Sequence, residues 1–76
     1  MKDLLTYIAK SLVENPYAVS VNEVTKEDGS VLELRVAPED MGKVIGKHGR
    51  IAKEIRTVIK AAALRDNVKV SVDILD

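Results

Sequence analysis

The sequence predicts an α+β fold in which three helices cover one face of a mixed, three-stranded sheet, in the order α-β-β-α-α-β. Apolar residues recur at helical spacing over residues 3–14 and again from 38 to 64. They alternate with polar residues over 18–26, 32–36 and 68–74, which is the period of a half-buried strand. The dipeptide Asp28-Gly29 separates the first two alternating runs and is typical of a tight hairpin turn. We therefore expect one domain over residues 1–76.

The first helix is predicted over residues 3–14, with Asp3 as its N-cap. Asn15-Pro16 ends it, because proline disfavours helical backbone in the residue before it. In the first strand the alternation changes phase at Val24, which predicts a bulge or a twist near Glu23.

The second half of the chain contains two further helices and the last strand. Pro38 suits a first helical position, and the two acids after it favour the positive end of the helix dipole. This helix ends near residue 45 because Gly46 stops it, and the next runs from about Arg50 to about Leu64. The connection is long enough to make the second and third strands parallel, and such crossovers are almost always right-handed.

Composition excludes several classes of protein. A hydrophobic fraction of 46% is globular rather than disordered, and no apolar run approaches the roughly 20 residues that span a bilayer. The N-terminus carries an acid early and has no small-residue cleavage site, so we expect no signal peptide. The absence of cysteine excludes thiolate metal sites and fits a reducing cytoplasm. With one histidine and no spaced cluster of carboxylates, we expect neither a metal nor another cofactor.

Charge is unevenly distributed along a chain that is neutral overall. Residues 41–60 contain one acid and six cations: Lys43, Lys47, Arg50, Lys53, Arg56 and Lys60. Two solvated helix faces would account for this excess. A basic patch on an otherwise acidic body is also the electrostatic footprint of a site for a short nucleic-acid strand.

A glycine motif lies between the last two predicted helices: Val44-Ile45-Gly46-Lys47-His48-Gly49-Arg50-Ile51. Glycines without Cβ atoms let another backbone come close, and the start of the following helix favours anions. Both features indicate that the ligand is the phosphodiester backbone of a nucleic acid. A P-loop is excluded because three residues, not four, separate Gly42 from Gly46, and His48 stands where Ser or Thr is required. A dinucleotide fingerprint would need glycine in place of Val44.

The motif Val44-Ile45-Gly46-x-x-Gly49-x-Ile51, within the predicted element order, resembles a type II KH domain. Residues 36–51 resemble the small bacterial KhpA proteins, which are single KH domains of about this length. The resemblance covers the whole chain. It implies a groove that holds four nucleotides of RNA, clamped by the GxxG loop. It also implies self-association, pairing with a larger KhpB-type KH protein, and an RNA-chaperone or post-transcriptional role linked to cell-envelope growth and cell shape.

The predicted contacts to single-stranded RNA are Lys43, Ile45, Gly46, Lys47, His48, Gly49, Arg50, Ile51 and Lys53. The cations would attract phosphates, and Ile45, Ile51 and Ile55 would form an aliphatic groove floor. The absence of Phe and Trp disfavours the modules that stack bases on aromatic rings. His48 has no group at a sensible spacing to orient it as a base, so we expect no enzyme activity and no small-molecule substrate. Tyr17 is interpreted as a packing or interface residue.

The helix predicted from Arg50 to Leu64 is apolar over an arc of about 200°, wider than one sheet requires. Alanines as plain helix formers would account for part of this arc. We predict instead a subunit interface at Val58, Ala61 and Ala62, since small residues permit close helix approach. Two other functions stay open: a helix-turn-helix DNA binder that reads bases with Arg50 and Lys53, and a protein-interaction adaptor that uses this helix.

Overall fold

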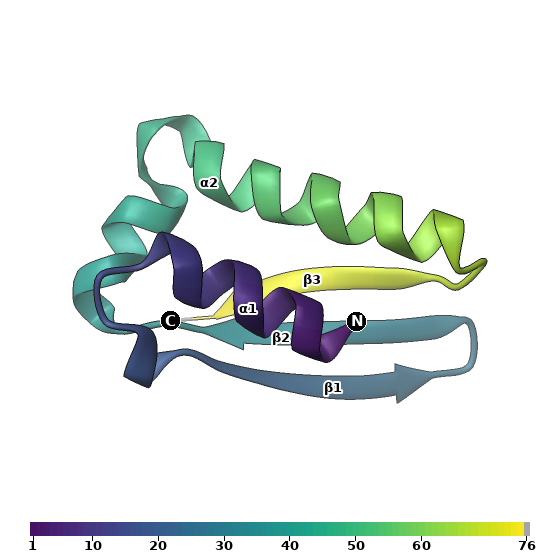
Figure 1. Ribbon diagram of the computed structural model, residues 1–76. Helices are drawn as coiled ribbons and strands as arrows, with labels where there is room; N and C mark the ends of the chain where they lie inside the picture. The colour runs from purple at the N-terminus through teal and green to yellow at the C-terminus, as the bar shows by residue number, and fades with distance from the viewer. Residues whose placement is uncertain (76) are drawn as a thin grey trace.

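The computed structural model describes residues 1–75, except for the side chains of residues 45–48. The elements are α1 (Lys2–Leu12), the 3-10 helix η1 (Pro16–Ala18), β1 (Ser20–Lys26), β2 (Gly29–Arg35), α2 (Pro38–Arg65) and β3 (Val70–Leu75). The strand order is β1-β2-β3, with β1 antiparallel and β3 parallel to the central β2, as predicted. Figure 1 shows α1 and α2 together on one side of this sheet.

Helix α2 consists of two arms. Gly49 has a φ of +67°, which no α-helical residue adopts, and the ribbon of α2 changes direction sharply between its teal and green parts (Figure 1). The first arm (residues 38–44) and the second arm (residues 50–65) match the two helices expected from the sequence. The order α-β-β-α-α-β is therefore confirmed. No atom lies within 4 Å of a Cβ built on Gly49, so glycine is required here by the backbone conformation and not by crowding.

The core lies between the sheet and the two helices. The register pairs Val21 with Leu34 and Leu32 with Val72, so these side chains share the face that the helices cover. The second arm of α2 contributes one narrow buried stripe: Ala52, Ile55, Ile59 and Ala63. Leu5 and Ala9 of α1 are fully buried against the same face. The helical and strand periodicities in the sequence thus correspond to the observed core.

Two local predictions were wrong. The expected bulge near Glu23 does not form, because β1 pairs with β2 without interruption from Ser20 to Lys26. Val24 lies instead on the uncovered face of the sheet opposite Val31, and Glu23 reaches solvent because β1 is an edge strand. Nor is Asp3 the N-cap. The amide of Leu5 donates to the carbonyl of Met1 (3.0 Å), so the helix begins one residue earlier than Asp3.

The corner after α1 is held by a buried carboxylate. Asp40, in the first turn of α2, is only 1% exposed. Its Oδ1 accepts the amide of Glu14 and its Oδ2 accepts the amide of Asn15, each at 3.1 Å. Because both oxygens accept hydrogen bonds, burial of the carboxylate is compensated. Asp40 thereby ties the corner between α1 and β1 to the first arm of α2.

The hairpin turn is locked to the start of β3 by a glycine. Gly29 has a φ of +152°, and a Cβ at this position would lie 2.5 Å from the carbonyl oxygen of Lys69 and 2.8 Å from its Cβ. The amide of Ser30 donates to the same carbonyl (2.9 Å). A side chain at position 29 would meet the backbone of Lys69, so glycine is required where the hairpin end packs against the start of β3.

We expect Asp40→Asn to lower the free energy of unfolding by about 2–4 kcal/mol, because an amide NH₂ would face a backbone N–H inside the protein. Urea unfolding followed by circular dichroism measures the loss. The control is Glu39→Gln, on the neighbouring exposed residue, which should change stability by less than about 0.5 kcal/mol. Equal effects of the two substitutions would show that the buried carboxylate is not important for stability.

A second pair of substitutions tests the glycine contact. Gly29→Ala should destabilise the protein by about 1–3 kcal/mol, because the methyl group meets a backbone carbonyl and the φ is unfavourable for alanine. Gly42→Ala is the matched control: it lies in the first arm of α2 with no atom within 4 Å of its Cβ. Since alanine favours helix, this control should stabilise the protein by up to about 1 kcal/mol. Thermal unfolding of both variants would be compared, and a tolerated Gly29→Ala would contradict the assignment.

Candidate nucleic-acid interface

The segment predicted to contact RNA joins the two arms of α2. Four of the predicted contacts lie outside the described side chains: Ile45, Gly46, Lys47 and His48. The residues on either side are described. Val44 before the segment and Ala52 after it are both buried in the core, whereas Arg50 is exposed. The segment is therefore anchored at both ends.

The flanking cations are on the surface and take part in weak ion pairs. Lys43 Nζ lies 3.3 Å from Glu14 Oε1, and Arg50 Nε lies 3.5 Å from Glu54 Oε1. Lys53 is also exposed. Surface pairs of this kind contribute about 0–1 kcal/mol, so a phosphate could replace either carboxylate at little cost. The three predicted cations are thus available to an anionic ligand beside the segment.

The predicted aliphatic groove floor is only partly supported. Ile51 is half-buried and packs against the core, so part of its side chain faces outward. Ile55 is 1% exposed and belongs to the buried stripe of α2, so it cannot touch a base. Its assignment to the floor was wrong, because Ile55 packs with Ala52 and Ile59 in the stripe that is buried against the sheet.

The structure reveals a groove that sequence reasoning missed. A hollow of about 360 Å³ runs between the second arm of α2 and β3, and it is lined by Arg56, Ile59, Lys60, Val70, Ser71 and Val72. We call it the α2–β3 groove. Strand β3 pairs with β2 alone, so its other edge faces this groove. Arg56 Nε donates to the carbonyl of Val72 (3.4 Å), so the guanidinium lies across that edge.

The groove is electropositive. Among its described lining residues there is no carboxylate to offset Arg56 and Lys60. With Lys53 these cations are spaced three and four residues apart, which puts them on one side of the helix, next to the predicted contacts. That spacing was visible in the sequence. Which side of the helix faces β3 was not.

The residues of the predicted subunit interface are accessible on the surface of the single chain. Val58 is 45% exposed, Ala61 is exposed and Ala62 is half-buried. Leu64, on the same arm, is 72% exposed and was not predicted to belong to this surface. The excess apolar arc of the helix therefore lies outside the core. Tyr17 on η1 is 97% exposed, which excludes the packing role proposed for it and leaves the interface role.

Within residues 1–75 apart from the side chains of 45–48, no group of three His, Cys, Asp or Glu residues is placed to hold a metal ion. No helix in that part of the chain is long and apolar enough to cross a membrane.

Comparison with known proteins agrees with this geometry. A family model of the KH domain of KhpA and KhpB matches residues 2–74. The chain is 64% identical over 75 residues to the RNA-binding protein KhpA of Clostridium perfringens, covering 99% of this chain and 100% of that protein. It is 67% identical over 75 residues to the protein of the same name from Clostridium acetobutylicum, with the same coverage. The KhpA of Treponema pallidum is 45% identical over 75 residues, covering 99% of this chain and 94% of that relative. Since the match, the element order and the glycine motif agree over the full fold, the chain belongs to the KhpA/KhpB family of KH domains.

Proposed function

We propose that this protein binds short single-stranded RNA at the segment between the two arms of α2. The observation that carries the proposal is that the helical arm following this doubly anchored glycine segment also forms one wall of the electropositive α2–β3 groove. The phosphates would pass the glycines and the surrounding cations, and the bases would enter the groove. The relatives' name, RNA-binding protein KhpA, supports the same reading.

In this proposal specificity is modest. The cations attract phosphates whatever the base. Base selection would come from the edge of β3, whose backbone groups face the groove, and from Arg56. No aromatic platform is needed. We further propose the cytoplasmic RNA-chaperone or post-transcriptional role, linked to cell-envelope growth and cell shape, that the family resemblance implies.

The structure weakens the DNA-binding alternative. A recognition helix would present the first turns of the second arm to the major groove of DNA. Ala52 and Ile55 in those turns are buried against the sheet, so only one side of these turns is free. An unstructured RNA should therefore bind more tightly than duplex DNA of equal length, and a filter-binding comparison measures the difference.

Substitution of the segment itself is the direct test. Changing Lys47 and His48 together to aspartate should abolish RNA binding, at least a hundredfold in Kd at low salt, because like charges would face the phosphates. The fold should be unaffected. The control changes Lys10 and Ser11, exposed on α1, to aspartate and so alters the charge by the same amount. Fluorescence anisotropy on a labelled oligouridylate measures both. Unchanged affinity in the first variant would place the RNA elsewhere and favour the protein-interaction adaptor.

We also propose that the outer side of the second arm joins two chains, either two copies of this protein or one copy and a KhpB-type partner. One four-nucleotide site binds weakly, and holding two such sites together raises the overall affinity without any new contact. The exposed Val58, Ala61 and Leu64 supply the apolar area, and the small Ala62 would let a partner helix approach.

Val58→Lys should convert a dimer into a folded monomer, raising the dissociation constant of the dimer by at least tenfold. A charge in the middle of an apolar contact cannot be paired there. Thr25→Lys, at an exposed position on β1, the strand farthest from α2 in the sheet, is the control and should leave association unchanged. Sedimentation velocity measures both. A dimer that survives Val58→Lys, or an unaltered protein that is already monomeric, would contradict the proposed self-association.

A further inference from the structure

The row of cations on α2 continues beyond the α2–β3 groove. Arg56 and Lys60 line the groove beside β3, and Lys53 lies one turn before Arg56. With a rise of about 1.5 Å per residue, the three cations cover about 10 Å along the helix. The next cation along the chain, apart from Arg65 at the helix end, is Lys69, just before β3. Figure 1 shows β3 running along α2 from that end, so Lys69 extends the row away from the glycine segment.

A second hollow lies next to the groove, around the free edge of β3. It has a volume of about 200 Å³, and its lining includes Lys26, Ser30 and Lys69. We call it the hairpin hollow. Val70 and Ser71 line both hollows, so the two meet at the free edge of β3; the hairpin hollow lies on the uncovered face of the sheet, where its lining residues Val31 and Ser71 pair with each other. A chain leaving the α2–β3 groove would therefore enter the hairpin hollow without crossing the core.

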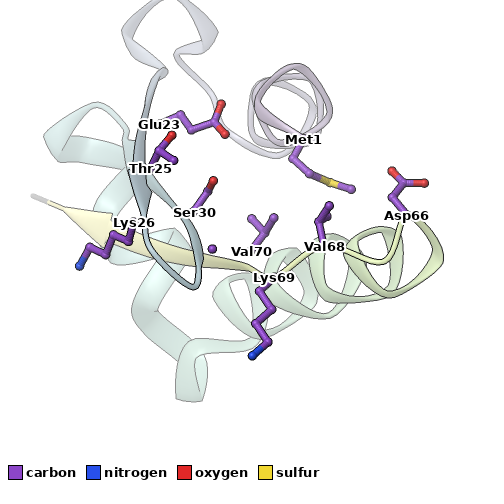
Figure 2. Close-up of a pocket in the computed structure, with 10 residues that line it drawn as sticks. Met1, Glu23, Thr25, Lys26, Ser30, Asp66, Val68, Lys69 and Val70 are labelled. Atoms are coloured by element: carbon purple, nitrogen blue, oxygen red, sulfur yellow. The ribbon is translucent and has the colours of Figure 1, made fainter.

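Two lysines are held together at the far end of this path. Lys26 pairs with Gly29 across the hairpin, and Gly29 lies directly against the backbone of Lys69. Figure 2 shows the side chains of Lys26 and Lys69 extending to the same side, away from the carboxylates of Glu23 and Asp66. Those two acids line another hollow, on the side of Met1, to which Lys26 and Lys69 also contribute, so the two lysines lie between this hollow and the hairpin hollow.

Acids mark where the path stops. Asp28 is the one carboxylate among the described lining residues of the hairpin hollow, and Glu27 precedes it at the exposed turn. A polyanion would be attracted as far as the two lysines and repelled beyond them. Basic residues thus line the path along this edge, and acidic residues lie at its end.

We propose that the RNA site is longer than the four-nucleotide clamp: the strand continues from the α2–β3 groove into the hairpin hollow, where Lys26 and Lys69 bind its phosphates. This inference rests on the proposed function and extends it. It assigns to the hairpin end of the protein a role in RNA length selection that is separate from the glycine segment.

The test compares two RNA lengths in the full protein. Uridine oligomers of four and eight nucleotides are titrated into the unaltered protein, into a Lys26→Gln, Lys69→Gln double variant, and into a Lys2→Gln, Lys10→Gln control that removes the same charge from exposed positions on α1. Two-dimensional ¹H–¹⁵N NMR measures Kd and also shows which amides respond. Matching spectra of the free proteins establish that each variant is folded.

The double variant should bind the tetramer within about twofold of the unaltered protein and lose on the order of tenfold in affinity for the octamer. Its plot of log K against log salt for the octamer should be shallower by about 1.4, since each single-strand phosphate contact contributes about 0.7 to the slope. The amides of Lys26 and Lys69 should shift with the octamer and not with the tetramer. The control variant should match the unaltered protein.

Three results would overturn the inference. They are an octamer affinity unaffected in the double variant, an equal loss for tetramer and octamer, and no octamer-specific shift at the hairpin end. In each case tetramer binding that depends on Lys47 and His48 leaves the proposed clamp intact. If instead neither oligomer binds the unaltered protein, the proposed function itself fails.

Discussion

The carboxylate of Asp40 is the constraint on which the arrangement of the functional elements depends. A buried carboxylate is strongly unfavourable unless its oxygens are hydrogen-bonded, and here the amides of Glu14 and Asn15 satisfy both. These amides are free because α1 ends at Leu12. The end of α1, the entry into β1 and the first turn of α2 must therefore form together. Lys43, beside Glu14, is placed by the same corner.

The first arm of α2 is short and would not be stable alone. Its attachment to the corner by Asp40 and to the core by Val44 explains how seven residues can present the glycine segment in a defined position. On the other side of the segment, Ala52 begins the buried stripe of the second arm. The positive φ of Gly49 permits the change of direction between the arms. Asp40, Val44 and Ala52 thus fix the position of the glycine segment, and Gly49 supplies the backbone conformation that the turn requires.

The second arm serves three purposes on three sides. One narrow stripe, from Ala52 to Ala63, is buried against the sheet. The side toward β3 carries the cations of the groove, and the outer side leaves Val58 and Ala61 exposed. A single clamp of this kind is a weak site, so length of contact and pairing of sites are the two routes by which the protein could reach useful affinity.

Much of the fold could be predicted because its determinants are local. Alternation at 32–36 and 68–74, the proline at 38 and the glycine motif specify strands, helix start and turn through short-range sterics and periodicity. The same is true of the cations next to the segment. Where the prediction failed, two readings were locally possible. Val24 could mark a bulge that changes the alternation of the strand, or it could lie on the uncovered face of a regular strand. Only its pairing with Val31 decided between the two.

The sequence by itself therefore determined the order of elements, the family and the residues that flank the candidate clamp. Only the tertiary structure decided that Ile55 is core and not groove, that Asp40 holds a corner 25 and 26 residues away, and that Arg56 and Lys60 lie beside the edge of β3. It also brought Lys26 and Lys69 together through the close approach of Gly29. The physical reason is the same in each case. These properties depend on which side of a helix or strand packs against a distant part of the chain. Periodicity in the sequence shows that an element has an apolar and a polar side, but it does not show what each side contacts.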